Sequence, residues 1–356
     1  MKIKCNICKR VFEYPFEINN HRHEDCELDG VPINFWDSIY NDGEVGFDID
    51  PKQKGVFQYK SMFTTPIIKN ISLGEGNTKL TPYKNNVYIK NEATNPTGSF
   101  KDRGMPLLMN EALFYGKSEI AIVSTGNAAI SMIEYAKAYG LKSTVFVPKN
   151  LSNKKIKLLK NADKVVFCED IIKSFEDFFV YCRKNQNVFN GYLTSNLSYL
   201  QGLESITYEI YSELKYLPDY IIIPCASGGN IVAQARALEK LKKLGLANTK
   251  TKIVCVQISG GDPIYQGVNQ GEEKLFVIDN PIDSKTILSS DTCFNYPQIA
   301  RLVRQNVVVP LSINDSDIEN VQNYQTNLTA IAGIACYNKY IKIFENKKVV
   351  IIATAK

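Results

Sequence analysis

One lysine of this chain stands in a sequence setting that suits covalent chemistry. Lys101 follows a predicted turn at Asn95-Pro96 and a run of small residues, and it precedes a stretch that favours a helix. The positive end of a helix dipole and the guanidinium of Arg103 both favour a neutral amine, so they predict a lowered pKa for Lys101. A neutral amine forms Schiff bases with aldehydes. A lone lysine is usually an exposed residue without such a role. The neighbouring sequence segments must therefore show whether Lys101 has one.

Two strings downstream have the composition of ligand-binding loops. Residues 124–129 read Ser-Thr-Gly-Asn-Ala-Ala, after the apolar run 120–123 and before a helical pattern. A helix start of this kind directs backbone N–H groups and two hydroxyls at one point, which suits a carboxylate. Residues 226–230 read Ala-Ser-Gly-Gly-Asn, after the apolar run 220–224. A glycine-rich loop between a strand and a helix cradles a phosphate with main-chain donors.

The order of these strings is similar to that of a known family. Residues 95–104 read Asn-Pro-Thr-Gly-Ser-Phe-Lys-Asp-Arg-Gly, and residues 73–80 read Leu-Gly-Glu-Gly-Asn-Thr-Lys-Leu. Together with the two loops they resemble threonine synthase, of the fold type II (tryptophan-synthase-β-like) pyridoxal phosphate enzymes, although Lys79 stands where the family has a proline. The resemblance implies an α/β fold of two doubly wound lobes, pyridoxal 5'-phosphate as cofactor, and a homodimer.

The resemblance also implies a role for each matching residue. Lys101 matches the lysine that holds the cofactor and acts as the general base, and Asn127 matches the asparagine that binds the cofactor's ring hydroxyl. Thr354 matches the hydroxyl residue facing the ring nitrogen. The loop that receives the substrate carboxylate contains Ser124, Thr125 and Ala128. The phosphate cradle consists of Ser227, Gly228, Gly229, Asn230 and Ile231.

One segment departs from the family pattern and bears on the substrate. Tyr199 stands where threonine synthases have an arginine that helps hold a substrate phosphate, and Glu204 where they have a lysine. Losing these cations and gaining a carboxylate is expected to weaken a dianionic substrate. Lys154 and Lys155 could compensate if the small domain closes, so Lys155 is a candidate substrate-binding residue.

The sequence is therefore compatible with three functions. The first is threonine-synthase-like elimination and replacement by a pyridoxal-phosphate-dependent lyase, converting O-phosphohomoserine and water to threonine and phosphate. The second is β-replacement or β-elimination on an O-activated serine-type substrate. The third is a protein that keeps the fold and the cofactor but has no turnover.

Residues 1–30 have the spacing of a separate metal-binding unit. Cys5-x-x-Cys8 is followed by His23-x-x-Cys26, and three thiolates with one imidazole make a closed tetrahedral zinc site. His21 is the spare candidate for the fourth ligand. The alternative is a zinc-free fold with incidental cysteines.

The composition limits the class of protein. The 356 residues have a net charge of +5, and 44% of them are hydrophobic, as in an ordinary globular protein. The lysines are scattered and no apolar run reaches the about 18 residues of a membrane span, so we expect neither a nucleic-acid nor a membrane partner. Nine cysteines, several in apolar runs, indicate reduced thiols and a cytoplasmic location.

Strands and helices alternate along most of the chain, as in a parallel α/β protein. Strands are expected at 88–90, 120–123, 144–147, 164–167, 220–224, 252–257 and 349–353, and helices at 201–214, 231–244, 315–325 and 328–343, with a long loop between 257 and 315. The expected domains are a zinc-knuckle-like extension at 1–30, a large cofactor-binding domain at 31–105 and 191–356, and a small mobile domain at 106–190.

Overall fold

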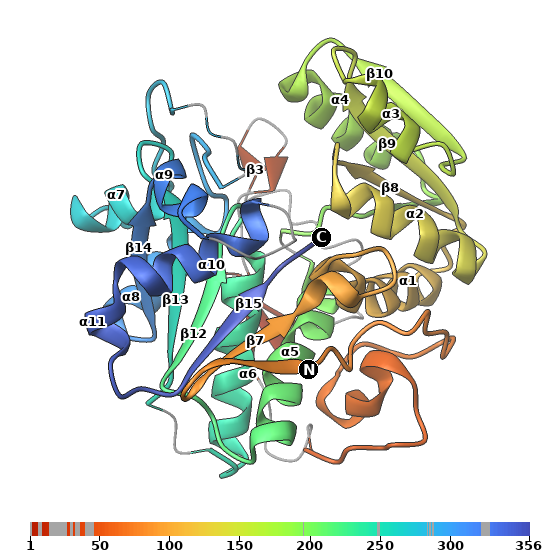
Figure 1. Cartoon of the computed structure of the whole chain (residues 1–356). Helices are drawn as coiled ribbons and strands as arrows, with labels where there is room; N and C mark the ends of the chain where they lie inside the picture. The colour runs from red at the N-terminus through yellow and green to blue at the C-terminus, as the bar shows by residue number, and fades with distance from the viewer. Residues whose placement is uncertain are drawn as a thin grey trace. The chain divides into compact units, whose positions relative to one another are not determined.

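The computed structural model describes residues 2–5, 9–13, 27–28, 31–32, 36–39, 46–194, 196–247, 250–282, 284, 286, 288–321 and 328–356. The chain divides into two compact units, shown with the course of the chain in Figure 1. The first unit comprises Met1–Glu75 and Lys101–Gly202, and the second comprises Gly76–Phe100 and Leu203–Lys356. The predicted mobile domain at 106–190 lies inside the first unit.

The second unit is built on a six-stranded sheet with the order β14-β13-β12-β15-β7-β6. All neighbouring strands are parallel except the antiparallel pair β6 and β7. Long β-branched runs are expected here, because central parallel strands are covered on both faces. The strands are β6 (Leu80–Lys84), β7 (Val87–Asn91), β12 (Tyr220–Pro224), β13 (Lys252–Ile258), β14 (Val308–Ile313) and β15 (Val349–Ala353).

The helices of this unit correct part of the sequence prediction. The expected long loop after β13 contains two helices and strand β14, whose Pro310 is tolerated because β14 lies at the edge of the sheet. The predicted helix 328–343 is interrupted at Tyr340, which is not helical. The described helices are α5 (Leu197–Leu214, which begins in the first unit), α6 (Gly229–Lys243), α7 (Pro263–Asn269), α8 (Tyr296–Arg304), α9 (Asp315–Glu319), α10 (Leu328–Lys339) and α11 (Ile341–Phe344).

The first unit contains a four-stranded parallel sheet with the order β10-β9-β8-β11. The predicted alternation is confirmed here, because β8, β9 and β10 are each followed by a helix of this unit and β11 leads into α5. The strands are β8 (Glu119–Val123), β9 (Lys142–Pro148), β10 (Lys164–Cys168) and β11 (Val188–Asn190). The helices are α1 (Met105–Phe114), α2 (Asn127–Tyr139), α3 (Asn153–Leu158) and α4 (Ile171–Lys184).

Helix α4 illustrates why these segments fold as they do. The Asp170 side chain accepts a hydrogen bond from the Lys173 N–H at 2.7 Å and caps the helix start. Ser174, Phe178 and Cys182 are buried at a spacing of four residues, which gives α4 one face that packs on the sheet. Phe146 of β9 meets Phe178 edge to face at 5.9 Å.

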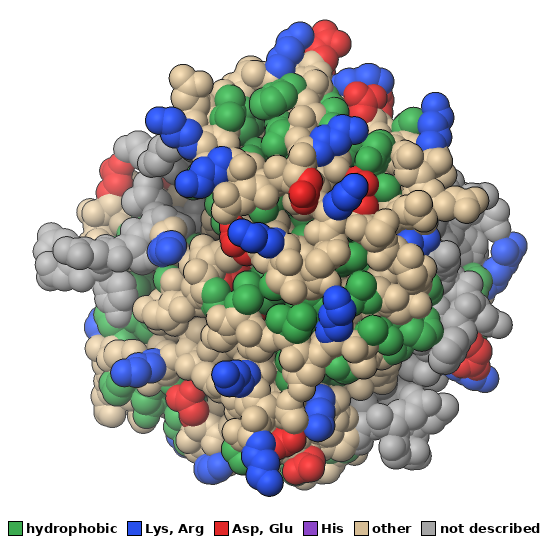
Figure 2. All heavy atoms as spheres, turned by 90° about the vertical axis from the view of Figure 1, so that its right-hand side faces the viewer, with side chains coloured by type: hydrophobic (Ala, Val, Ile, Leu, Met, Phe, Trp, Pro, Cys, Tyr) green, Lys and Arg blue, Asp and Glu red, His purple; other side chains and the backbone are tan. Residues whose placement is uncertain are grey.

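The N-terminal segment forms short strands among its described residues. Strand β1 (Lys2–Cys5) pairs antiparallel with β2 (Val11–Glu13) and β5 (Trp36–Ile39), and β3 (Glu27–Leu28) pairs with β4 (Val31–Pro32). No helix in the described part of the chain is long and apolar enough to cross a membrane. On the face drawn in Figure 2, lysine and arginine side chains are scattered among other atoms and do not form one continuous basic surface.

Candidate active site

The predicted cofactor residues of the second unit follow the carboxyl ends of neighbouring strands. Strands β12, β15 and β7 are adjacent and parallel, so their carboxyl ends lie at one edge of the sheet. The glycine-rich loop follows β12, Thr354 follows β15, and the segment that leads to Lys101 follows β7. Ligands of open α/β sheets bind at this edge.

The glycine-rich loop is shaped to receive an anion. Gly228 precedes α6 with a φ of +85°, and no side chain caps the helix start. A Cβ at this position would lie 2.7 Å from the Ile299 side chain and 2.8 Å from that of Asn295, so only glycine fits. The Asn295 Nδ2 donates to the Ser227 carbonyl at 2.8 Å and fixes the loop. The first N–H groups of α6 therefore remain for a ligand.

Two buried polar atoms near these strand ends have no hydrogen-bond partner among the described residues. These two atoms, the Ser99 Oγ and the Asn230 Nδ2, can donate a hydrogen bond, whereas the Asn295 Oδ1 beside the loop, which also has no partner in the described part of the chain, can only accept one. The Asn230 Oδ1, in contrast, accepts a hydrogen bond from Gln234 at 2.7 Å. A buried polar group without a partner is costly, and at a binding site it indicates that a ligand supplies the partner.

The segment before Lys101 is tied to the end of β15. The Phe100 N–H donates to the Thr354 carbonyl at 3.0 Å, and the Lys356 N–H donates to the Gly98 carbonyl at 3.0 Å. Thr354 is buried. Lys101 is the next residue after Phe100. The backbone directly before Lys101 is therefore held by a hydrogen bond to Thr354, at the end of β15.

Hydrogen bonds of Asn95 hold the turn at the start of this segment. Its Nδ2 donates to the Glu92 carboxylate at 2.7 Å, and its Oδ1 accepts from the Gly76 N–H at 2.9 Å. The Thr78 hydroxyl donates to the same carboxylate at 2.7 Å. The turn predicted at Asn95-Pro96 is therefore held from both sides.

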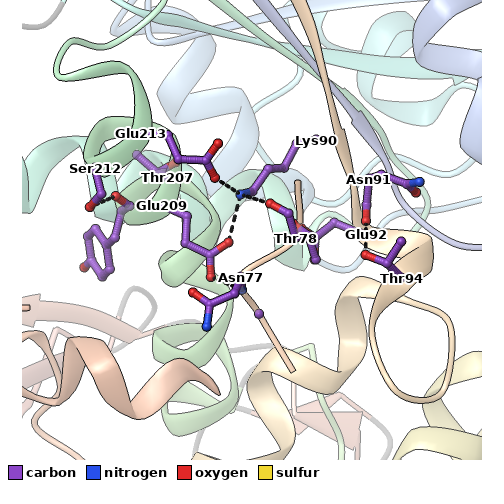
Figure 3. Close-up of polar contacts among 12 residues, drawn as sticks. Asn77, Thr78, Lys90, Asn91, Glu92, Thr94, Thr207, Glu209, Ser212 and Glu213 are labelled. Atoms are coloured by element: carbon purple, nitrogen blue, oxygen red, sulfur yellow. Dashed lines mark hydrogen bonds and ion pairs between the residues drawn. The ribbon is translucent and has the colours of Figure 1, made fainter. Parts of the chain in front are cut away.

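A buried ion cluster supports the strand from which this segment departs. Figure 3 shows Lys90 of β7 directed at two carboxylates of α5. Its Nζ lies 2.8 Å from Glu209 and 3.2 Å from Glu213, and it donates to the Thr78 carbonyl at 2.6 Å. Glu209 also accepts from the Asn77 N–H at 2.7 Å. The cluster thereby joins β7, α5 and the turn at 77–78.

Lys101 has the lowered pKa that was predicted for it, and burial is the main cause. It lies in the 3₁₀-helix Phe100–Gly104 ahead of α1 and is partly buried. Loss of water lowers its pKa to about 8, and the neighbouring Asp102 carboxylate opposes that change. Burial is therefore the main cause of the lowering, whereas the sequence prediction relied on the helix dipole and Arg103.

Close packing within the first unit fixes the backbone around Lys101. A Cβ on Gly104 would lie 2.2 Å from the ring of Tyr199, and one on Gly202 would lie 2.2 Å from the Arg103 carbonyl. The start of α5 therefore lies directly against this loop. Tyr199, which replaces the family's arginine, is a buried packing residue.

The predicted carboxylate loop is also placed at a strand end, in the first unit. It follows β8 and leads into α2, whose first residue is Asn127. The Gly126 N–H donates to the Ser124 Oγ at 3.2 Å, no side chain caps the helix, and residues 124–128 are partly exposed. Lys155 is exposed on α3 after the adjacent parallel strand β9. The Lys154 side chain lies outside the described part of the chain.

Glu204, the carboxylate that was expected to weaken a dianionic substrate, has its charge balanced within the protein. Its carboxylate is fully buried and receives the Arg236 Nε at 2.9 Å, the Lys240 Nζ at 2.5 Å and the Tyr208 hydroxyl at 2.7 Å. Its charge is therefore balanced between α5 and α6. Glu204 joins two helices and gives no reason to exclude an anionic substrate.

Most of the predicted zinc ligands lie outside the described residues, namely Cys8, His23 and Cys26, and so does the spare His21. Cys5 ends β1; its N–H donates to the Arg10 carbonyl at 2.9 Å, and its carbonyl accepts from the Lys9 N–H at 3.1 Å. The described residues contain no group of three or more metal-binding side chains. The zinc site stays a prediction from spacing.

Some residues around the site were not singled out from the sequence. Ser99 and Asp102 lie inside the string at 95–104, and Ser131 stands four residues after Asn127, so helical spacing could have indicated it. Asn295 comes after an irregular segment, and no sequence pattern relates it to the loop at 226–230.

Comparison with known proteins identifies the family of this chain. The family profile of the pyridoxal-phosphate dependent enzymes matches residues 71–312. The threonine synthase of Methanosarcina acetivorans is 27% identical over 84% of this chain and 76% of its own, and that of Methanocaldococcus jannaschii is 27% identical over 71% and 65%.

Among solved structures, an L-serine ammonia-lyase from Rhizomucor miehei superposes with a TM-score of 0.65 at 21% identity, over 79% of this chain and 93% of its own. At that identity the likeness concerns the fold, and it confirms the predicted α/β class. This chain belongs to the pyridoxal-phosphate-dependent enzyme family, has its type II fold, and resembles the threonine synthases within it.

Proposed function

We propose that this protein is a lyase of the threonine synthase type, converting O-phosphohomoserine and water to threonine and phosphate. One observation carries the proposal: a partly buried lysine with a pKa of about 8 comes directly after Phe100, whose N–H is bound by Thr354 at the end of β15, and the neighbouring strand β12 leads into a glycine cradle for an anion. The similarity to threonine synthases supports the reaction class.

The residues present fit pyridoxal 5'-phosphate. The uncapped start of α6 with Gly228 suits its phosphate, and the unpartnered Ser99 Oγ and Asn230 Nδ2 are donors that an anionic oxygen would satisfy. Lys101 would hold the aldehyde and Asn127 the ring hydroxyl. Thr354 would offer a neutral hydroxyl to the ring nitrogen, which would not favour protonation of that nitrogen.

The chain's own residues then have separate tasks in the reaction. When bound, the cofactor withdraws electrons from the amino acid and weakens its Cα–H bond. Lys101 removes and returns protons, because its amine is neutral in a usable pH range. Ser124, Thr125 and Ala128 belong to the loop that would bind the substrate carboxylate through N–H groups and hydroxyls.

A second function has one observation in its favour. Tyr199 is buried against Gly104, so the position of the family's phosphate-binding arginine is filled by an uncharged ring. Lys155 is exposed, and its amine would have to supply the missing positive charge. If it does not, an O-activated serine-type substrate with a smaller anionic demand becomes the better candidate, for β-replacement or β-elimination.

Spectra and steady-state rates test these alternatives. Protein reconstituted with pyridoxal 5'-phosphate is expected to absorb in the visible, and the spectrum should change on adding the true substrate. A kcat/KM for O-phosphohomoserine of about 10⁴ M⁻¹s⁻¹ or more would establish the first function. Turnover of O-acetylserine or O-phosphoserine alone would establish the second. A coloured protein that turns over none of them would be a cofactor-binding protein without activity.

We also propose one structural zinc, held by Cys5, Cys8, His23 and Cys26. The spacing supports it, as does the tight turn in which the Lys9 N–H donates to the Cys5 carbonyl. Metal analysis of protein made in zinc-replete, reducing medium should give one zinc per chain. A substoichiometric value, or an unchanged content in a Cys8→Ser variant, would contradict the site.

Two further proposals concern the cell and the assembly. None of the seven described cysteines forms a disulfide, which supports a reducing compartment such as the cytoplasm. A homodimer is proposed from the family resemblance, and light scattering coupled to size exclusion would test it.

A further inference from the structure

Helix α2 has a buried polar stripe with a regular spacing. Ser131, Tyr135 and Tyr139 follow one another at intervals of four residues, and all three are fully buried. The Tyr135 hydroxyl donates to the Glu75 carboxylate at 2.8 Å, and the Tyr139 hydroxyl donates to the Ile71 carbonyl at 2.7 Å. These bonds fix the helix that carries the loop at 124–128 at its start.

The first member of the stripe reaches the loop of the candidate nucleophile. The Ser131 Oγ donates to the Asp102 Oδ1 at 2.5 Å. Asp102 is fully buried and follows Lys101 directly in the chain. A hydroxyl donor favours the ionised form of a buried carboxyl and restricts its rotation.

Several groups of the first unit surround this carboxylate. Arg103, the next residue in the loop, is fully buried. Tyr135 of α2 and Tyr199 of α5 interact electrostatically with the Asp102 carboxylate. The Tyr135 hydroxyl in turn donates a hydrogen bond to Glu75. Asp102 opposes the effect of burial on the neighbouring amine. A buried amine without such a neighbour is neutral at lower pH but is a weaker base.

We propose that Asp102, fixed by the Ser131 hydroxyl, is a positioning residue that keeps the Lys101 amine an effective base in spite of its burial. The inference deepens the proposed function and rests on Lys101 being the base. The hydrogen bond from Ser131 also joins Asp102 to α2, the helix that carries the candidate carboxylate loop.

The test measures the amine itself in the full-length protein before cofactor is added. Brief acetic anhydride pulses between pH 6 and 10, with peptide mass spectrometry, give the midpoint of Lys101 acetylation. The wild-type midpoint is expected near pH 8. Asp102→Asn should lower it by about one pH unit, which at pH below both midpoints is about tenfold faster labelling. Ser131→Ala should shift it in the same direction by less, and Ser131→Thr should restore it.

Ser143→Ala is the control, because it removes another serine–aspartate hydrogen bond of the same unit, between the buried Ser143 and the exposed Asp163 at 2.9 Å. Its midpoint should equal that of the wild type. Unfolding curves show whether each variant is folded. If Asp102→Asn does not fold, the acetylation midpoints of Ser131→Ala and Ser131→Thr test the proposal instead.

An unchanged or raised midpoint in folded Asp102→Asn would overturn the proposal, as would an equal shift in the Ser143 control. Failure of the proposed function looks different, since the wild type would then remain colourless with pyridoxal 5'-phosphate whatever the labelling midpoints. In active protein, the acidic limb of the kcat–pH profile of Asp102→Asn should move to lower pH along with a lower kcat.

Discussion

Lys90 and Lys101 stand eleven positions apart in the chain, and their surroundings are opposite in character. Lys90 is completely removed from water, but two carboxylates and a carbonyl surround its ammonium (Figure 3). Lys101 keeps some exposure, and desolvation lowers its pKa in spite of the adjacent Asp102 carboxylate. A buried lysine with a full set of acceptors is a structural cation, whereas one with incomplete compensation becomes a nucleophile and a base.

The largest effect should come from removing the reactive lysine. Lys101→Ala should lose the visible absorbance band and lower kcat by at least about 10³-fold, because it removes both the covalent anchor and the base. Absorbance spectra and steady-state assays measure this. Lys101→Arg keeps the positive charge but cannot form the covalent bond, so it should fail equally. Persistent colour with near-normal turnover in either variant would break the comparison.

The structural lysine should matter for stability and not for colour. Lys90→Met leaves Glu209 buried without its cation, and we expect a loss of about 3–5 kcal/mol in the free energy of unfolding. Denaturant titration measures it. The double variant Lys90→Met, Glu209→Gln should recover part of the loss, because the uncompensated charge is gone.

An exposed lysine gives the matched control for this experiment. Lys173 forms ion pairs with Glu176 and Asp177 at 3.1 Å on the surface of α4. Lys173→Met should cost at most about 1 kcal/mol, as is usual for exposed pairs. Equal losses at Lys90 and Lys173 would contradict the assignment of Lys90 as a buried structural cation.

The contrast between the two lysines also shows what a sequence can reveal. The string at 95–104 singled out Lys101, while Lys90 looked like an ordinary strand residue, because its partners Glu209 and Glu213 are more than a hundred positions away. The strands β7, β8, β9, β10, β12, β13 and β15 were found where apolar runs are continuous, and the three-residue strand β11 was missed. Strand β14 was missed because Pro310 and its edge position weaken the pattern.

The same distance limit explains the errors at the site. Glu204 was expected to weaken a dianionic substrate, since the sequence does not show that Arg236 and Lys240 of the next helix balance its charge. The cause of the lowered pKa of Lys101 was also missed, because burial depends on packing such as that of Tyr199 on Gly104. Local motifs were predictable, and the long-range contacts that set their electrostatics were not.

A glycine substitution would show whether the cradle matters to the reactive lysine. Gly228→Ala introduces a side chain 2.7 Å from Ile299 at a φ of +85°, so the loop must shift. We expect the dissociation constant for pyridoxal 5'-phosphate to rise about tenfold, which is about 1.4 kcal/mol. Gly245→Ala is the control, because its φ is +69° and nothing lies within 4 Å of its Cβ. It carries the backbone strain without the crowding, and its affinity should stay normal.

A further effect is the pH dependence of stability that Lys101 itself contributes. Its pKa falls from 10.5 to about 8 on folding, so the unfolded chain binds this proton more tightly than the folded one. Between about pH 8 and 10.5 the free energy of unfolding should therefore gain a positive slope with pH, while below pH 8 both states hold the proton and no slope arises. Lys101→Met lacks the group, so subtracting its pH profile from that of the wild type isolates the contribution. Lys90→Met should leave the difference profile unaltered in this window if the two lysines differ as described. A wild-type profile that falls relative to Lys101→Met above pH 8 would mean that Lys101 is a compensated cation like Lys90, and the contrast between them would be lost.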